Sequence, residues 1–321
     1  MATEVTIDGT FEQVALNVQF ITGVVPETLG VATYECIISN QQFFGLSVPE
    51  ISYELTFNND VSYTAPAGPT DPDFDKVELL LHMDGADGGT VFLDSSKNTF
   101  PVTAYGTAQT DSDIVKYGTA SGYFDGSTGY LDLLPSTAFD YGTGDFTVEF
   151  WFRSPETRVG GFGRVLGHPV STNVTGGFQI WHASSASFGS IVDGVALALP
   201  TGSGVIVKTT VPVTPLGWCH IAFTRRAGIA RCFLNGELQE TAASSENFNL
   251  GGVEGIRIGN RGDLAATTYL KGNLDDLRIT KGYARYVENF TAPTAPFPNT
   301  GGPTVTITTM APDWRRPRRA I

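Results

Sequence analysis

Short runs of β-forming residues recur about every ten residues through the middle of the chain, and this pattern constrains the fold more than any other feature. Gly-rich turns separate the runs, an arrangement typical of antiparallel sandwiches and barrels. We therefore predict an all-β domain. Its strands are expected at Val77–His82, Gly122–Phe124, Tyr130–Leu133, Phe146–Phe152, Arg164–Leu166, Gly177–Trp181, Ala196–Leu199, Val205–Thr210, Trp218–Arg225, Ala230–Leu234, Glu237–Thr241, Ile256–Ile258 and Gly272–Thr280.

The clearest turn signal is Asn235-Gly236, between two of these strands. A two-residue type I′ turn needs positive φ at both central positions, and Asn followed by Gly meets that need. Composition agrees with an all-β chain. With 37 Gly, 18 Pro and only 17% charged residues, helix bundles and coiled coils are disfavoured, and we expect no helix longer than a turn or two.

Proline-rich stretches divide the chain into four segments. Residues 1–64 are predicted to form a small acidic β-rich domain, and residues 65–75 a stiff linker with three prolines. Residues 76–298 form the large β domain, and residues 299–321 a tail that ends in basic residues.

Further strands are expected outside the large domain. Ile51–Phe57 and Val61–Tyr63 flank the turn signal Asn58-Asn59-Asp60, which indicates a hairpin. In the tail, Thr304–Thr308 is a candidate for one more strand.

The net charge of −13 is unevenly distributed. Residues 1–75 hold eleven acidic residues and no Lys or Arg, which argues against a nucleic-acid partner, since phosphate must be neutralised by cations. A basic protein partner, a cation site and a solvated surface stay open. No apolar run approaches the length of a membrane span, so no membrane insertion is expected, and no signal peptide is visible.

Ordered motifs within the large domain carry a family resemblance. They are Leu79-Leu80-Leu81-His82-Met83-Asp84-Gly85, Asp94-Ser95-Ser96, Gly122-Tyr123-Phe124-Asp125-Gly126, Asp145-Phe146-Thr147-Val148-Glu149-Phe150-Trp151, Gly217-Trp218-Cys219-His220-Ile221-Ala222, Phe233-Leu234-Asn235-Gly236, Ile258-Gly259 and Gly272-Asn273-Leu274-Asp275-Asp276-Leu277-Arg278-Ile279. In this order they resemble a laminin G-like (concanavalin A-like) jelly-roll domain over residues 76–298. The ending Gly282-Tyr283-Ala284-Arg285-Tyr286, with Phe290-Thr291-Ala292-Pro293-Thr294, resembles the version common in bacteriophage virion proteins.

The resemblance implies a two-sheet antiparallel sandwich whose rim loops bind glycans or proteins, often beside a structural Ca²⁺. Calcium positions in the family use the early Asp motifs and the late Asp pair, and here these are Asp84, Asp94, Asp275 and Asp276. Neighbouring residues on a strand point to opposite faces, so Asp275 and Asp276 both ligate only if a bulge intervenes. The alternative is that one of them pairs with Arg278 and the other is solvated.

Sugars need flat apolar faces beside polar groups, and four residues near Gly-rich loops are candidates for such contacts: Trp181, His182, Tyr269 and Tyr283. The alternative is that Trp151, Trp181 and Trp218 belong to the sandwich core, the commoner place for Trp on a strand. Glucan-cleaving enzymes of this fold class carry Glu-x-Asp-x-x-Glu on one strand, and that spacing is absent here. We therefore expect a protein that is not an enzyme.

These features together predict a structural and binding protein of a bacteriophage virion, either a capsid decoration or a tail or fibre component. Its front domain would contact other virion proteins, and its sandwich would face outward and bind host cell-surface glycan. The protein is expected to form a homo-oligomer, with a trimer as one option. A soluble bacterial lectin-like module is the first alternative, and a glycan-cleaving enzyme the second.

The basic tail is predicted to dock on an acidic surface, such as the front domain of another copy. The residues expected to serve this assembly contact are Trp314, Arg315, Arg316, Arg318 and Arg319. The alternative is a frayed terminus.

Overall fold

The chain divides into two compact units, residues 66–303 and residues 1–65 with 304–321. The computed structural model describes residues 33–38, 51–56, 61–64, 70–157, 161–169, 176–185, 191–199, 204–249, 251–260, 268–301 and 304–307. We call the 66–303 unit the sandwich domain. Residues 70–75, within the predicted linker, belong to this unit.

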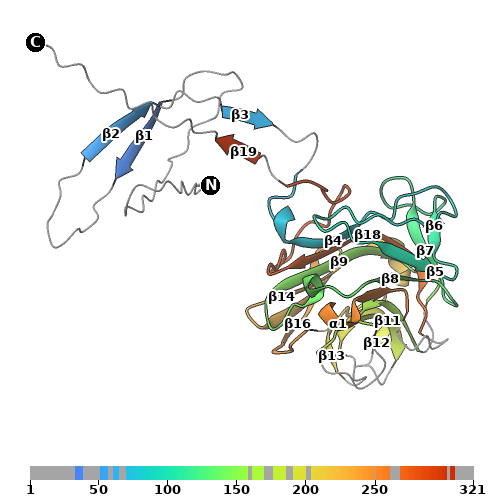
Figure 1. Cartoon of the computed structure of the whole chain (residues 1–321). Helices are drawn as coiled ribbons and strands as arrows, with labels where there is room; N and C mark the ends of the chain where they lie inside the picture. The colour runs from blue at the N-terminus through green and yellow to red at the C-terminus, as the bar shows by residue number, and fades with distance from the viewer. Residues whose placement is uncertain are drawn as a thin grey trace, which may run out of the picture. The chain divides into compact units, whose positions relative to one another are not determined.

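In the described residues of the other unit, the strands form two antiparallel pairs (Figure 1). Strand β1 (Thr33–Ile38) pairs with β2 (Ile51–Thr56), and β3 (Val61–Thr64) pairs with β19 (Thr304–Ile307). The strands expected at Ile51–Phe57, at Val61–Tyr63 and in the tail are present, whereas the β-forming runs at residues 4–7 and 11–21 lie outside the described residues. The predicted hairpin between β2 and β3 is wrong, because each strand pairs with another partner, and the partner of β3 comes from the far end of the chain.

Two antiparallel sheets make up the sandwich domain, as predicted (Figure 1). The eight-stranded sheet has the order β16 (Glu237–Ala243), β15 (Ile229–Leu234), β14 (Cys219–Arg226), β9 (Phe146–Arg153), β18 (Lys271–Lys281), β7 (Ser121–Asp125) and β6 (Gln109–Asp111), with β4 (Val77–Leu81) also paired to β18. The seven-stranded sheet has the order β13 (Val205–Lys208), β12 (Ile191–Ala198), β11 (Gln179–Ser185), β10 (Phe162–Gly167), β17 (Ile256–Ile258), β8 (Tyr130–Leu133) and β5 (Val102–Tyr105).

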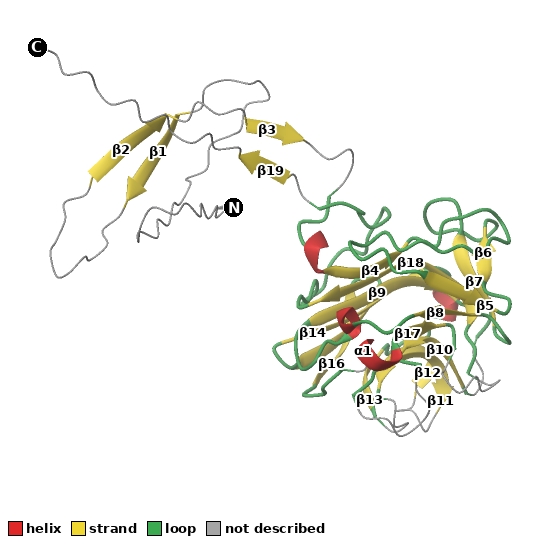
Figure 2. Cartoon of the chain, in the orientation of Figure 1, coloured by secondary structure: helices red, strands yellow, loops and turns green. Residues whose placement is uncertain are grey.

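Helical segments in the described residues are short, as Figure 2 shows. They are η1 (Phe74–Lys76), η2 (Thr137–Phe139), η3 (Thr214–Leu216) and α1 (Gly251–Glu254). Within the described ranges no helix is long and apolar enough to cross a bilayer. Strands β5 and β6 were not expected from the sequence. Both are only three or four residues long and are defined by pairing with β8 and β7.

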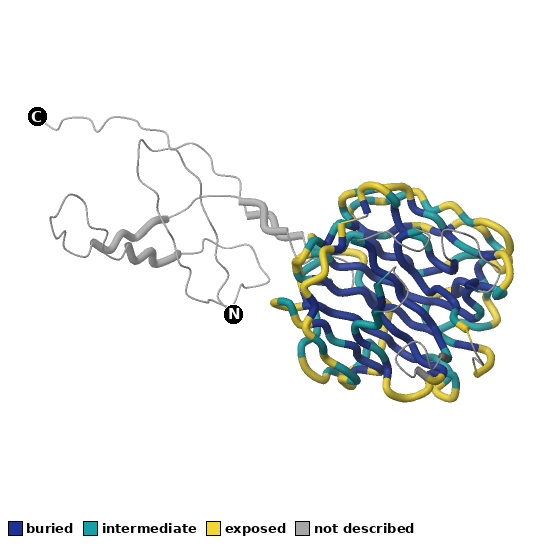
Figure 3. Tube along the Cα trace, turned by 90° about the horizontal axis from the view of Figure 1, so that it is seen from below, coloured by how far each residue is buried: buried dark blue, intermediate teal, exposed yellow. Residues whose placement is uncertain are grey.

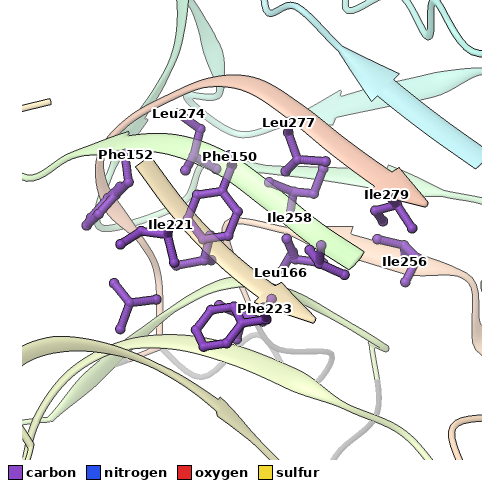
Figure 4. Close-up of a cluster of buried hydrophobic side chains, with 14 of the residues drawn as sticks. Phe150, Phe152, Leu166, Ile221, Phe223, Ile256, Ile258, Leu274, Leu277 and Ile279 are labelled. Carbon is purple, nitrogen blue, oxygen red and sulfur yellow. The ribbon is translucent and has the colours of Figure 1, made fainter. Parts of the chain in front are cut away.

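The core lies between the sheets and follows from strict alternation along the strands. On β9, Phe146, Val148, Phe150 and Phe152 all point into the space between the layers and are fully buried. Figure 4 shows Phe150 and Phe152 meeting side chains from β14, β17 and β18. Each buried Phe or Leu contributes about 2 kcal/mol to folding. Figure 3 shows that burial follows the strands, while exposure concentrates in the connecting loops.

The outer face of the eight-stranded sheet, which is turned away from the other sheet, is covered by residues 282–301. We call this segment the C-terminal strap. Its backbone is tied to the sheet where Phe290 N donates to Gly236 O (2.9 Å) and Phe297 N donates to the Asp276 carboxylate (2.6 Å). The end of the strap meets the start of the domain, since Asp71 N donates to Thr300 O (3.0 Å).

Candidate functional site

A buried ionic network fixes the strap on the outer face. Arg278 of β18 donates through Nε and Nη2 to Glu149 Oε1 on β9 (3.0 and 2.8 Å), and through Nη1 to Asp71 (3.0 Å). Arg285 of the strap donates to both oxygens of Asp71 (3.1 and 2.7 Å). Each carboxylate therefore meets at least one guanidinium, the arrangement that makes burial of charge tolerable.

The second oxygen of Glu149 joins the strap to β14. Tyr286 OH donates to Glu149 Oε2 (2.8 Å), and His220 Nε2 lies 3.2 Å from the same oxygen. Burial disfavours the charged carboxylate, but the charge of Arg278, the hydrogen bond with His220 and the charge of Arg285 together lower the pKa of Glu149 to about 2. The Tyr286 ring stacks on Phe290, with centroids 3.6 Å apart, so the strap itself is ordered along this face.

Beside the strap lies an open pocket of about 460 Å³. Its walls come from five places in the chain: the β6–β7 loop, β9, the segment before β14, the β15–β16 turn and the strap. The lining residues are Lys116, Tyr117, Trp151, Trp218, Asn235, Ala292, Pro293 and Thr294.

Aromatic rings and an ammonium group form one wall of the pocket. The Lys116 Nζ lies 3.9 Å from the centroid of the Trp151 ring, and Tyr117 meets the same ring edge-on at 5.8 Å. Tyr117 OH donates to Pro293 O (2.7 Å), which joins this wall to the strap. The side chain of Trp218, from the opposite side, is half-buried.

The β15–β16 turn places Asn235 at the rim. Asn235 and Gly236 have φ values of 50° and 84°, as the predicted type I′ turn requires. The exposed Asn235 side chain accepts a hydrogen bond from His220 N through Oδ1 (2.8 Å). This bond leaves the two N–H donors of the amide available to a ligand.

Asp275 holds the β6–β7 loop from below. Its Oδ2 accepts hydrogen bonds from the backbone N–H groups of Lys116 (2.9 Å) and Tyr117 (3.1 Å). Its Oδ1 is buried with no hydrogen-bond partner among the described residues. Burial raises the pKa of Asp275 to about 7, against the lowering effect of the two backbone bonds, and the neighbouring Asp276 raises it further.

The four carboxylates predicted to bind calcium do not form one site. Among the described residues, no group of three or more His, Cys, Asp or Glu side chains is placed to hold a metal ion. Asp84 is exposed and accepts from Thr119, whereas Asp94 is buried and accepts from the backbone of Leu80, Ser96 and Phe100. Each of these two carboxylates organises its own loop, and calcium binding stays a prediction that this geometry does not support.

A bulge does separate Asp275 from Asp276. The pairing register of β18 with β9 shifts between Asp275 and Arg278, and Asp276 has a φ of 47°. Asp276 lies 2.6 Å from His82 Nδ1 and accepts from Phe297 N, so it secures β4 and the strap. The alternative interpretation is also wrong, because neither Asp pairs with Arg278 and neither is solvated.

Trp181 and His182, predicted to bind glycan, lie on opposite faces of β11. Trp181 packs edge-on against Phe162 on the outer face of the seven-stranded sheet and is 2% exposed. His182 points inward, meets Phe152 and lies 2.9 Å from Asp193 Oδ1. Both are buried, so they do not present one surface to a sugar.

Tyr269 and Tyr283 are also separated. Tyr269 precedes and Tyr283 follows β18, an 11-residue strand, and a strand rises about 3.3 Å per residue. Tyr269 is buried, whereas Tyr283 is exposed and lies under Lys76 Nζ at 5.1 Å. The structure therefore does not bring the four predicted glycan contacts together.

The site residues that sequence reasoning missed are Trp151 and Trp218, which it interpreted as core. Neither belongs to the hydrophobic cluster between the sheets, although Trp151 is buried, with 5% exposure, on the outer face. Alternation along β9 could have placed Trp151 on the outer face, because Phe150 and Phe152 on either side of it occupy the inner face. The predicted assembly residues Trp314, Arg315, Arg316, Arg318 and Arg319 lie outside the described residues.

The sandwich domain is similar to known proteins in sequence and in fold. A family model described as the concanavalin A-like lectin/glucanases superfamily matches residues 125–285. The sandwich resembles the binding domain of Paraclostridial Mosquitocidal Protein 1, with a TM-score of 0.50 and 14% identity over 66% of this chain and 50% of that one. The similarity thus spans half of that binding domain, and at this identity it concerns the fold. No curated protein sequence matches the chain.

Two further structures are similar at lower scores. Domain 4 of AbnA, an extracellular arabinanase from Geobacillus stearothermophilus solved with arabinotriose, has a TM-score of 0.49 and 16% identity over 65% of this chain and 94% of that one. The binding domain of a botulinum neurotoxin of serotype D/C has a TM-score of 0.47 and 16% identity over 64% of this chain and 49% of that one.

Proposed function

The chain belongs to the concanavalin A-like lectin/glucanase superfamily, and from that membership we propose that its sandwich domain is a carbohydrate-binding module without catalytic activity. The pocket beside the C-terminal strap is its binding site. The observation that carries this proposal is the pocket lining, in which Trp151, Trp218 and Tyr117 stand beside Lys116 and Asn235.

The physical match is between this lining and the two sides of a sugar ring. The C–H face of a pyranose packs on a flat aromatic ring, and the half-buried Trp218 presents such a ring. Hydroxyl groups around the ring edge need hydrogen-bonding partners, which the Asn235 amide and the Lys116 ammonium supply. A volume of about 460 Å³ lies within the usual range for small-ligand pockets.

The carboxylates nearest the pocket support a role in binding over one in catalysis. Glycoside hydrolysis needs two carboxyl groups on either side of an accessible scissile bond. Glu149 and Asp275 are both fully buried. Glu149 accepts hydrogen bonds from Arg278, and Asp275 accepts them from the backbone of the β6–β7 loop. The pocket lining itself contains no carboxylate.

The test is a glycan array probed with the full chain and with Trp218→Ala. We expect the wild type to bind a defined subset of glycans and the variant to lose about two- to twelvefold in affinity, since one aromatic contact contributes about 0.5–1.5 kcal/mol. Trp181→Ala, which removes a Trp from the other sheet, is the matched control for affinity. No bound glycan, or equal binding by Trp218→Ala, would contradict the proposal.

We further propose that the chain is a structural component of a bacteriophage particle, anchored by residues 1–65 and presenting the sandwich outward. Support comes from the strap, since its residues 282–286 and 290–294 resemble the virion version of the family. The acidic first 75 residues suit contact with basic virion proteins or other copies of the chain.

Purified particles test this second proposal. Mass spectrometry should detect the full chain in them, and a chain lacking residues 1–65 should no longer be incorporated. Detection only in the unassembled fraction would favour the first alternative, a soluble bacterial lectin-like module. Incorporation of the truncated chain would show that the anchor lies elsewhere.

A further inference from the structure

Lys116 differs from three other lysines of the sandwich in how its charge is balanced, and from Lys281, whose Nζ donates to Thr137 O (2.7 Å). Lys76, Lys97 and Lys271 each form an ion pair with a carboxylate. Lys116 forms no ion pair with the described residues, and its Nζ lies over the Trp151 ring at 3.9 Å and over Tyr117 at 5.1 Å. The ring faces attract the cation but accept no N–H bond of normal strength.

The buried Asp275 carboxylate favours the charged form of Lys116 through space, but it forms no ion pair with the ammonium. Asp275 directs Oδ2 to the backbone N–H groups of Lys116 and Tyr117 and not to Nζ. No Asp or Glu lines the pocket, although the chain as a whole carries a net charge of −13. The ammonium at the pocket wall therefore has no carboxylate in direct contact among the described residues, and an acidic ligand can take that place.

Two other polar side chains at the pocket have N–H donors without a partner among the described residues. Asn235 uses its oxygen for His220 N, which leaves its N–H groups facing outward at the rim. Trp151 Nε1 is buried beside the pocket without an acceptor among the described residues. A pocket with spare donors, a cation and no carboxylate suits a ligand rich in acceptors and negatively charged.

We propose that the pocket selects saccharides that carry a carboxylate, with the acid group bound by Lys116 and the sugar ring packed on Trp218. This inference rests on the proposed carbohydrate-binding function and specifies its ligand class. Lys116 is preorganised for the task, because its own backbone N–H donates to Asp275 and its Nζ lies over the Trp151 and Tyr117 rings. Preorganisation lowers the entropic cost of binding.

The experiment is a glycan array on the full chain that pairs uronate- and sialate-containing glycans with their methyl esters and carboxyl-reduced forms. Esterification removes the charge while the ring and its hydroxyl groups remain. We expect binding to concentrate on the free acids and to fall about tenfold or more for esters and reduced forms, the effect of losing one charge-assisted hydrogen bond. Sulfated neutral-sugar glycans on the same array distinguish a carboxylate from another anion.

Two lysine variants localise the effect. Lys116→Gln should lose the preference for free acids, whereas Lys97→Gln, which removes a surface lysine paired with Glu78, should keep it. If esters bind as well as acids, or if Lys116→Gln keeps the preference, the inference is wrong while the carbohydrate-binding function stands. Stronger binding of sulfated glycans than of carboxylated ones also overturns it. If the array shows no bound glycan, both proposals fail.

Discussion

Trp151 of β9 lies directly opposite Asp275 of β18 in the pairing of these two strands, and both side chains are on the outer face of the eight-stranded sheet. This cross-strand pair joins Asp275, which binds the β6–β7 loop, to Trp151, which lines the pocket. Asp275 accepts a hydrogen bond from the backbone N–H of Lys116, and the Lys116 Nζ lies over the Trp151 ring. One cross-strand pair thus positions the ring, the loop and the cation.

Asp275→Asn should remove a pH dependence of stability. The pKa of Asp275 is about 7 in the folded state, above its usual value, so the folded chain binds one more proton than the unfolded chain between about pH 4 and 7. Wild-type stability therefore falls as pH rises through this window, by on the order of 2–4 kcal/mol from this group. Urea unfolding at pH 5 and pH 8 should show that the decrease is smaller in Asp275→Asn.

Asp113→Asn, a change at an exposed carboxylate, is the control for Asp275→Asn and should keep the wild-type decrease. An unchanged slope in Asp275→Asn would contradict the assignment.

Glu149→Gln should destabilise the domain by about 3–5 kcal/mol at neutral pH, because Arg278 would be left buried with one carboxylate fewer. The pKa of Glu149 is lowered to about 2, so its contribution is present above about pH 4.5 and is lost as pH falls toward 2. The difference between variant and wild type should therefore shrink at pH 3. Urea unfolding at pH 7 and pH 3 measures both values, and an equal difference at the two pH values would argue against the ionic role.

The strap should be part of the folding unit. A fragment of residues 66–303 is expected to melt in one cooperative transition, since it contains the complete core and the ionic network. A fragment of residues 66–281 loses Arg285, Tyr286 and Phe297 and exposes the network, so we expect no cooperative melt in the physiological range. Calorimetry of the two fragments decides the point, and similar midpoints would show that the strap is an accessory.

Trp181→Ala should lower stability without changing ligand affinity. Trp181 is buried beside Ala183 and Ala196 on the sheet opposite the pocket, and truncation of a buried Trp costs about 3–5 kcal/mol. Denaturant unfolding gives the loss, and titration of the folded variant with an array-positive glycan gives the affinity. A specific loss of affinity would restore the original prediction that Trp181 contacts sugar.

Removal of divalent cations should leave the sandwich unchanged. Asp84, Asp94, Asp275 and Asp276 accept hydrogen bonds from protein groups at separate places, and a ligand bound only to the native state would raise the melting temperature. We expect equal midpoints in EDTA and in millimolar CaCl₂. A lower midpoint in EDTA would revive the calcium prediction.

The amino-acid sequence by itself determined the sandwich and most of its strands. Alternation on β9 and the Asn235-Gly236 turn depend only on neighbours in the chain, because side chains alternate with period two and the turn needs two residues with positive φ. The all-β class followed from the same local signals.

Tertiary structure decided where the charged and aromatic residues meet. Asp71 and Arg285 are 214 positions apart, and Lys116 meets Trp151 only because β7 and β9 both flank β18 and the strap closes over them. Local patterns carry no record of which loop covers which face, so the sequence left core and ligand contact as alternatives for Trp181 and favoured the core for Trp151 and Trp218. Long-range packing decided these positions, since burial of a side chain depends on what packs against it from elsewhere in the chain. Trp151 is 5% exposed on the outer face of the eight-stranded sheet, Trp181 is 2% exposed on the other sheet, and Trp218 is half-buried.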